Sequence, residues 1–300
     1  MPCKKMTRHL SPWAIVCHRD GPCMLFTRGA SSVERSEEVG VMGTTNALFD
    51  LTGKTAVVTG SGRGLGKAIA RGLAQAGANV VVCGRTADIV SESAAELRAD
   101  GHEVLDVVFD AQAQEQVDAL IETTVAHFGR LDVMVVNHGI GQAAPAEDIT
   151  PAAWSAMINI NLSSAFSCAQ AAGRHMLAQG GGGSIIFTSS TSSLVVFERL
   201  TSYGAAKAGL DHTARHLAAE WGPHNIRVNV VAPGYMTSHM RGSEARYGDD
   251  EQSDKIVAMT PLRRKGEAWE LVGPVVFLAS DAASFVTGHV IPVDGGWCLL

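Results

Sequence analysis

The sequence predicts an α/β fold: a single doubly wound domain with a seven-stranded parallel sheet and helices on both faces. Seven short apolar runs alternate with helical segments, which is the order of β-α-β units. The runs are apolar throughout, as in strands that are buried on both faces. A glycine-rich segment, 60–66, follows the first run and opens a helix. These three observations indicate a Rossmann-like sheet, which binds ligands beyond the carboxyl ends of its strands.

Each element rests on a local pattern. The strands are short runs rich in valine and isoleucine, expected at 55–59, 79–83, 104–109, 133–136, 184–188, 227–231 and 290–293. The helices are expected at 67–77, 91–100, 112–128, 150–179 and 203–221. Thr150 is expected to cap the fourth helix, with Pro151 as its first residue, and glycines 180–183 end that helix.

Residues 1–45 differ from the rest of the chain, since we find no helical or strand periodicity in them. The segment is basic up to Arg28, as in targeting segments. It is alternatively an extension that arises from an early start codon, with Met42 as the true beginning, and we favour this second interpretation. We therefore expect residues 1–45 to lie outside the fold and residues 46–300 to form the domain.

Composition excludes several classes of protein. Of 300 residues, 46% are hydrophobic and 18% charged, which excludes a disordered chain. The net charge of −6 argues against nucleic acid as a partner. No stretch approaches the ~18 apolar residues of a membrane span. The six cysteines are scattered without a C-x-x-C pair, so we expect a reducing, cytoplasmic compartment and no metal site.

The glycine-rich segment indicates a dinucleotide. Gly60, Gly64 and Gly66 let the backbone approach a pyrophosphate, and the helix that follows offers free N–H groups. An acid at the end of the second strand would hold the ribose of NAD, but no acid occurs between Gly60 and Asp88. Arg85 stands there instead and can bind a 2′-phosphate, with Arg63 assisting. We therefore expect NADP, and NAD stays open.

A second motif indicates acid–base chemistry. Tyr203 and Lys207 are four residues apart in an expected helix, so they share one face. Hydride transfer to or from a carbonyl carbon requires a proton to move at the oxygen. A phenol with its ordinary pKa near 10 is a poor base at neutral pH, and a neighbouring ammonium favours the phenolate. Ser190, after the fifth strand, is expected to hydrogen-bond the substrate oxygen.

The chain resembles the short-chain dehydrogenase/reductase family over residues 47–298. The motifs that match are Thr59-Gly-x-x-x-Gly-x-Gly66, Asp110, Asn137-His138-Gly139, Asn161, Ser190, Tyr203-x-x-x-Lys207, Asn229-Val-Val-Ala-Pro233-Gly234 and Val293-Asp294-Gly295-Gly296.

The resemblance implies a role for each matching residue. Tyr203 is the acid/base, Lys207 also binds the nicotinamide ribose, and Asn161 holds a water that links Lys207 to solvent. Asp110 bonds the adenine amino group, and Asn137 steadies the central strand. The implied catalytic residues are Asn161, Ser190, Tyr203 and Lys207. The implied cofactor-binding residues are Gly60, Arg63, Gly64, Leu65, Gly66, Arg85, Asp110, Ala111, Asn137, Gly139, Tyr203, Lys207, Pro233, Gly234, Met236 and Ser238.

One position inside the motifs departs from the family pattern. His138 replaces a small residue close to the cofactor. One interpretation is that His138 contacts substrate or titrates during the reaction. The other, which we favour, is that it packs beside the cofactor without taking part in the chemistry.

Substrate contacts are expected from segments 140–146, 191–202 and 238–261, the last as a mobile lid. Residues 238–254 include two arginines and five acids, which argues against an acidic carrier protein as partner. Segments 49–54 and 270–273 are similar to gluconate-type dehydrogenases. We therefore expect a small polar alcohol, such as a sugar or sugar acid, as substrate.

Two alternatives remain beside this NADP-dependent oxidoreductase. The chain also resembles 3-oxoacyl-carrier-protein reductases, which act on thioesters. A non-catalytic dinucleotide sensor on the same fold is disfavoured, because sensors can lose the tyrosine or the lysine and this chain keeps both. The resemblance further implies a homotetramer or homodimer, and we expect neither nucleic acid nor membrane as a partner.

Overall fold

The computed structural model describes residues 13–16, 24–27, 44–238 and 250–299. The chain divides into two units, 1–42 and 43–300. In the first unit, β1 (Trp13–Val16) pairs antiparallel with β2 (Met24–Thr27). The expectation of no strand in residues 1–45 is wrong here. Each strand is a run of apolar and β-branched residues, and Gly21-Pro22 between them is a turn signal.

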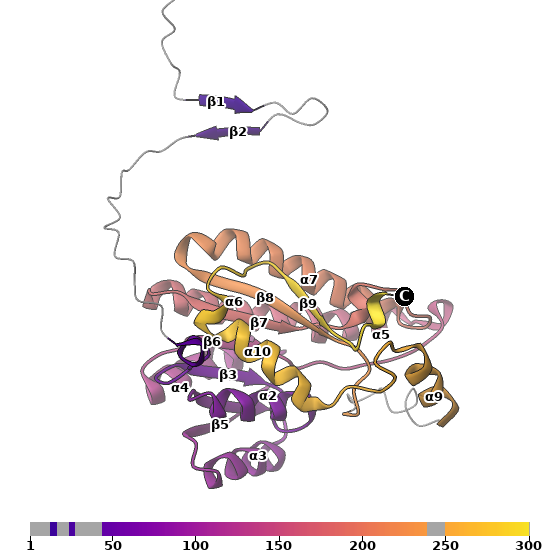
Figure 1. Cartoon of the computed structure of the whole chain (residues 1–300), viewed down its shortest axis with the longest axis horizontal. Coiled ribbons are helices and arrows are strands. Elements are labelled where there is room, and N and C mark those ends of the chain that lie inside the picture. The colour runs from indigo at the N-terminus through magenta and orange to yellow at the C-terminus, as the bar shows by residue number, and fades with distance from the viewer. Residues whose placement is uncertain (1–12, 17–23, 28–43, 239–249, 300) are drawn as a thin grey trace, which may run out of the picture. The chain divides into compact units, whose positions relative to one another are not determined.

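The second unit contains a parallel sheet of seven strands, as expected (Figure 1). The strands are β3 (Thr55–Thr59), β4 (Asn79–Gly84), β5 (Val104–Val108), β6 (Val133–Val136), β7 (Gly183–Thr188), β8 (Ile226–Pro233) and β9 (Val290–Val293). Their order across the sheet is β5-β4-β3-β6-β7-β8-β9. The order reverses between β3 and β6, and this switch point is where doubly wound sheets bind ligands.

Helices connect the strands and cover both faces of the sheet (Figure 1). They are α1 (Thr45–Leu48), α2 (Gly64–Gln75), α3 (Ala87–Ala99), α4 (Gln114–Phe128), α5 (Pro151–Ile158), α6 (Ser164–Gln179), α7 (Thr201–Trp221), α9 (Asp250–Met259) and α10 (Val272–Ala279). A π-helical turn, Asn159–Ser163, joins α5 to α6. The Thr150 hydroxyl accepts from the Ala153 N–H at 3.2 Å, so the predicted cap is confirmed.

Two cores sandwich the sheet. One contains buried residues of α4, α6 and α7, the other those of α2, α3 and α10. Neighbouring residues of a strand enter opposite cores: Val57 lies in the first, and Ala56 and Val58 in the second. Since side chains alternate between the faces of a strand, a strand covered on both sides has to be apolar throughout, which explains the continuous runs in the sequence.

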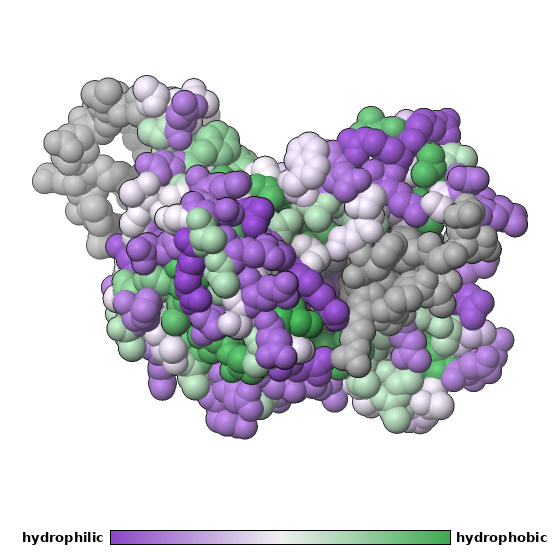
Figure 2. Space-filling view, turned by 90° about the horizontal axis from the view of Figure 1, so that it is seen from below, coloured by the Kyte–Doolittle hydropathy of each residue, from purple (hydrophilic) through white to green (hydrophobic). Residues whose placement is uncertain are grey.

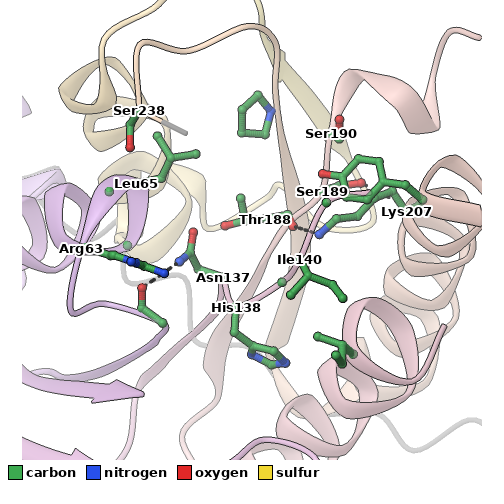
Figure 3. Close-up of a pocket in the computed structure, with 18 of the residues that line it drawn as sticks. Arg63, Leu65, Asn137, His138, Ile140, Thr188, Ser189, Ser190, Lys207 and Ser238 are labelled. Atoms are coloured by element: carbon green, nitrogen blue, oxygen red, sulfur yellow. Dashed lines mark hydrogen bonds between the residues drawn. The ribbon is translucent and has the colours of Figure 1, made fainter. Parts of the chain in front are cut away.

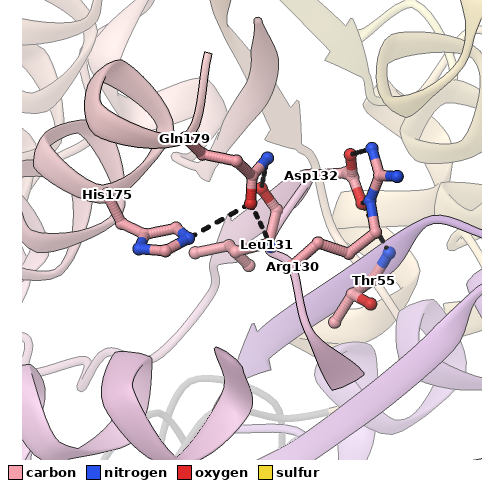
Figure 4. Close-up of polar contacts among 6 residues, drawn as sticks. All are labelled: Thr55, Arg130, Leu131, Asp132, His175 and Gln179. Carbon is pink, nitrogen blue, oxygen red and sulfur yellow. Dashed lines mark hydrogen bonds and ion pairs between the residues drawn. The ribbon is translucent and has the colours of Figure 1, made fainter. Parts of the chain in front are cut away.

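A polar network holds the amino ends of the two central strands (Figure 4). The Asp132 carboxylate, almost fully buried, accepts from the Thr55 N–H at 2.9 Å and from the Arg130 guanidinium at 2.6 and 2.7 Å. The Gln179 amide bonds both the N–H and the carbonyl of Leu131, at 3.0 and 3.2 Å. These contacts fix the starts of β3 and β6 relative to each other. They therefore also help to place the carboxyl ends of both strands next to each other.

Several element bounds differ from the prediction. Helix α2 begins at Gly64 rather than 67 and α3 at Ala87 rather than 91, so the glycine loop runs directly into the first turn of α2. Helix α10 and α9 were not predicted. Helix α10 contains Pro274, which sits in its first turn, where a missing N–H breaks no helical bond.

The face drawn in Figure 2 carries hydrophilic side chains over most of its area, with apolar residues in small patches between them. Among the described residues, none of the helices is both long and apolar enough to cross a membrane.

Candidate active site

A cavity of about 430 Å³ opens at the carboxyl ends of the central strands. Figure 3 shows Arg63, Leu65 and Ser238 on one side of it and Lys207 and Ser190 on the other. All of the residues expected to bind the cofactor line this cavity, and so do Ser190, Tyr203 and Lys207. Of the residues predicted for the site, only Asn161 does not line it.

The glycine loop forms one wall of the cavity. Gly60 and Gly64 have φ of +67° and +58°, a region that favours glycine. A Cβ on Gly66 would lie 2.3 Å from the Gly60 carbonyl oxygen, so no side chain fits there. Helix α2 begins at Gly64 without a side-chain cap. The N–H groups of its first turn therefore remain available to an anion.

Asn137 fixes this loop against the centre of the sheet. Its Nδ2 donates to the Thr59 carbonyl at 3.1 Å, and its backbone N–H donates to the Thr59 hydroxyl at 2.9 Å. Asn137 follows β6 and Thr59 ends β3, so the two strands at the switch point are joined where the loop starts. This gives the predicted steadying role of Asn137 a geometric basis.

Two arginines lie at the end of the cavity where β3 and β4 finish. Arg63 and Arg85 are exposed, and neither side chain makes an ion pair with another described residue. Asp110, after β5, accepts from the Gln112 N–H at 3.0 Å and also lines the cavity. No carboxylate occupies the turn after β4 beside Arg85, so this end of the cavity suits a phosphate.

Tyr203 and Lys207 stand on one face of α7 at the other end, as the spacing predicts. Lys207 Nζ lies 5.8 Å from the centroid of the Tyr203 ring and donates to the Thr188 carbonyl at 2.9 Å. Lys207 is 2% exposed. Burial lowers its pKa from 10.5 to about 8, and the Asp211 carboxylate partly opposes this change. The site therefore holds an ammonium of weakened proton affinity next to a phenol.

Asn161 lies in the π-helical turn, behind the residues that line the cavity. Its Nδ2 donates to the Ile140 carbonyl and its Oδ1 accepts from the Ile140 N–H, both at 3.1 Å. A Cβ on Gly139 would lie 2.6 Å from Asn161 Oδ1 and 3.7 Å from Lys207 Nζ. Only glycine therefore fits at position 139, because any side chain would clash with the Asn161 amide. The π-helical turn has no signal in the sequence periodicity, which predicted an unbroken helix.

His138 lines the cavity and bridges the ends of β3 and β6 to α6. Its Nε2 lies 2.9 Å from the Ser164 hydroxyl and its Nδ1 2.9 Å from the Thr59 hydroxyl. The Ser164 hydroxyl donates to Ile160, so it accepts from Nε2–H. Burial is the main cause that lowers the pKa of His138 to about 4, with Lys207 next. A neutral histidine bonded at both nitrogens favours the interpretation as a packing residue.

Two hydroxyls of the cavity wall were not singled out from the sequence: Thr188, and Ser192 within the expected segment 191–202. Thr188 Oγ1 and Ser192 Oγ are buried and have no hydrogen-bond partner among the described residues. Buried polar groups are normally paired, so both hydroxyls are candidates to bind a ligand. Of the expected segments 140–146 and 191–202, residues 140–143, Thr191, Ser192, Phe197 and Leu200 line the cavity. Of the expected lid, Ser238 lines the cavity, residues 239–249 lie outside the described residues, and α9 forms a helix.

The chain is similar to known dehydrogenases and reductases. A family model described as enoyl-(acyl carrier protein) reductase matches residues 60–298. The chain is 39% identical over 251 residues to the 2-dehydro-3-deoxy-D-gluconate 5-dehydrogenase of Escherichia coli, which covers 84% of this chain and 98% of that protein. It is 42% identical over 262 residues to a sorbose reductase of Schizosaccharomyces pombe, covering 84% and 98%.

A solved structure shows the same architecture. The gluconate 5-dehydrogenase from Burkholderia cenocepacia, in complex with NADP and tartrate, superposes with a TM-score of 0.81 at 36% identity. The match covers 85% of this chain and 99% of that one.

Proposed function

The chain belongs to the short-chain dehydrogenase/reductase family, and we propose that it interconverts a secondary alcohol and a ketone with NADP. The observation that carries this proposal is the pairing of a glycine-lined anion cradle with Tyr203 and Lys207 in one cavity. The substrate class we propose is a small polar alcohol such as a sugar or sugar acid. Relatives named for gluconate derivatives and for sorbose support it.

The cavity fits the dinucleotide on structural grounds. The first turn of α2 would hold the pyrophosphate, and Gly66 would let it approach the backbone. Arg85, with Arg63, would hold the 2′-phosphate by charge-assisted bonds. The Thr188 hydroxyl, which has no partner among the described residues, would be available to bond the cofactor. When bound, the nicotinamide supplies or accepts the hydride.

Side chains of the protein transfer the proton to and from the substrate oxygen. In the reductive direction, the Tyr203 hydroxyl donates its proton to the carbonyl oxygen as the carbonyl carbon receives hydride, and Ser190 holds that oxygen. The Lys207 ammonium stabilises the phenolate that remains. Asn161 positions the Ile140 backbone next to Gly139, where a water chain from Lys207 would begin. In the oxidative direction each of these proton movements is reversed.

Location and assembly are part of the proposal. We propose a cytoplasmic enzyme, since the free cysteines among the described residues are consistent with a reducing compartment. We also propose a homotetramer or homodimer, supported by exposed apolar residues on α5 and α6, Trp154 and Phe166. Reduction of the keto group of a 3-oxoacyl thioester is the second candidate activity. The matched family model, described as enoyl-(acyl carrier protein) reductase, supports an acyl thioester as the substrate.

Replacement of the phenol tests the proposed function. Tyr203→Phe should lower kcat for NADPH-dependent ketone reduction by roughly a hundredfold or more, the range of general acid–base catalysis. NADPH binding, followed by its fluorescence, should persist, because the cradle does not include the hydroxyl. A panel of ketones, sugar acids and acyl thioesters, followed by NADPH absorbance, identifies the substrate class. Unchanged turnover in the variant would refute the role of Tyr203.

A further inference from the structure

Helix α7 contains a buried carboxylate that the proposed chemistry does not use. Asp211 is 4% exposed, and neither of its oxygens has a hydrogen-bond partner among the described residues. It does not line the cavity. Buried carboxylates are normally paired with a charge or with donors, so the position of Asp211 requires a physical reason.

Two hydroxyls lie beside this carboxylate but donate elsewhere. The Ser189 hydroxyl donates to the Lys207 carbonyl at 3.4 Å, and the Ser193 hydroxyl donates to the Ser190 carbonyl at 2.7 Å. Burial raises the pKa of Asp211, and these two hydroxyls and the Lys207 ammonium partly oppose this change. The charged form of Asp211 is therefore favoured in part by the lysine of the active site.

The spacing along α7 places Asp211 on the same face as the acid–base pair. Tyr203, Lys207 and Asp211 follow one another at intervals of four residues, and all three are buried. Helical residues four apart have Cβ atoms about 5–6 Å from each other. Asp211 therefore lies one turn from Lys207 and two turns from Tyr203. This face of the helix presents a phenol, an ammonium and a carboxylate in that order.

The elements that pack against α7 differ in the charges they contain. Helix α5, the π-helical turn, β7 and the turn Thr191–Ser193 all contact α7, and their sequences include no acidic, basic, cysteine or tyrosine residue. The other elements in contact are α6, β8 and the turn Gly222–His224. Their titratable side chains are Cys168, Arg174, His175, Arg227 and His224.

These five side chains are neutral or engaged elsewhere, or lie far along α7. Burial raises the pKa of the Cys168 thiol to about 12. Arg174 and His175 bond glutamines of their own helix, and Arg227 donates to the carbonyls of Leu278 and Ser280. His224 follows the carboxyl end of α7, four turns beyond Lys207.

Two further groups face the lysine and the carboxylate. Burial, followed by the charge of Lys207, lowers the pKa of His138 to about 4, so His138 is neutral at pH 7 and adds no charge. Arg215, an exposed residue of α7, favours the charged form of Asp211. For Lys207 itself, burial lowers the pKa to about 8 and Asp211 is the group that opposes this change.

We propose that Asp211 is a positioning residue of the reaction, whose carboxylate holds Lys207 in the ammonium form that stabilises the Tyr203 phenolate. Asp211 acts through Lys207 and touches neither substrate nor cofactor. A buried negative charge favours the protonated state of its neighbours, and water and salt screen it weakly. The inference rests on the proposed function and adds a residue to it.

The pH dependence of turnover in the full-length protein tests this role. We measure kcat for NADPH-dependent reduction of a ketone from the panel between about pH 5 and 10. Asp211→Asn should move the alkaline limb to lower pH by about half a unit to one unit, because Lys207 and Tyr203 then lose their protons more easily. The acid limb of the oxidative reaction should move in the same direction. A limb that stays in place overturns the inference.

A second neutral variant and a control separate charge from shape. Asp211→Ser is smaller than Asp211→Asn, so equal displacements in both report the lost charge, and either variant carries the test alone. Glu220→Gln removes the same charge from an exposed position of α7 and should keep the parent profile. A fall in kcat that is uniform across pH overturns the inference. Failure of both variants to fold also overturns it, because a carboxylate without hydrogen-bond partners is not expected to be required for folding.

An optical titration distinguishes this failure from failure of the proposed function. The ultraviolet absorbance of phenolate, with Tyr203→Phe as the reference, follows the Tyr203 proton without any turnover. Reduction of none of the ketones refutes the proposed function. The Tyr203 phenol should nevertheless titrate at lower pH in Asp211→Asn than in the parent, and equal titrations overturn the inference about Asp211.

Discussion

Lys207 combines burial with charge, and its replacement by methionine gives the sharpest test of the site. The pKa of Lys207 falls from 10.5 to about 8, which at 1.36 kcal/mol per pH unit corresponds to about 3 kcal/mol against the charged form. Methionine removes that cost. It also leaves the Thr188 carbonyl without its donor, which costs about 1–3 kcal/mol. We therefore expect Lys207→Met to be close to the parent in stability at pH 7, or slightly more stable, and to lose turnover.

The pH dependence isolates the lysine from the lost hydrogen bond. Between pH 8 and 10.5 the unfolded chain binds more protons at this lysine than the folded chain, so the parent gains stability as pH rises. The methionine variant lacks this gain. Its stability relative to the parent should therefore fall by about 2 kcal/mol between pH 7 and 9.5.

Urea unfolding at equal protein concentration measures this difference, since assembly makes stability concentration-dependent. Lys255→Met is the matched control, because Lys255 is 63% exposed in a surface ion pair with Glu251. Its offset from the parent should stay nearly constant over the same pH range. An equally constant offset for Lys207→Met would show that Lys207 keeps an ordinary pKa, and would refute the electrostatic reasoning about the site.

Three further predictions concern the cofactor, the fold and the first unit. Arg85→Asp should shift the NADP/NAD ratio of kcat/KM toward NAD by roughly tenfold or more, since a charged hydrogen bond contributes about 1.5–3 kcal/mol; an unaltered ratio would show that Arg85 does not bind the 2′-phosphate. Asp132→Asn should lower the free energy of unfolding by about 1–3 kcal/mol, with unchanged NADPH affinity, because it weakens the bonds to Thr55 and Arg130; urea unfolding checks it, and equal stability contradicts it. Deletion of residues 1–41 should leave turnover and stability intact, since both cores and the cavity lie in the second unit; an insoluble product contradicts it.

The strands were predictable because their determinants are local. The bounds of β3, β6 and β9 agree with the expected runs, since each strand is a short continuous run of mostly β-branched and apolar residues. The glycine loop and the Tyr203–Lys207 pair were predictable for the same reason, because each depends on spacing within one segment. Helix α10 was missed because its eight residues are nearly all apolar, and such a run has no helical period to detect.

The role of His138 could not be decided from the sequence, because its surroundings come from elsewhere in the chain. Thr59 and Ser164 supply the two hydroxyls that bond its ring, 79 and 26 residues away. Both partners suit the neutral form, and a protonated ring would need a second acceptor in a buried position. A histidine in a motif is informative only when its two partners are known.

The two ends of the cavity also differ in whether their determinants are local in the sequence. Family membership therefore predicts cofactor binding better than it predicts the substrate. The cofactor end depends on backbone: positive φ at Gly60, the free N–H groups of α2, and the absence of a side chain at Gly66. A short motif encodes all three. The opposite end, near Tyr203, depends on side chains such as Phe197 and Tyr235, which line the cavity from two segments that only the fold brings together. A relative can therefore keep the whole motif and still bind a different substrate, so the name of a relative constrains the chemistry at the carbonyl more strongly than the identity of the molecule that carries it.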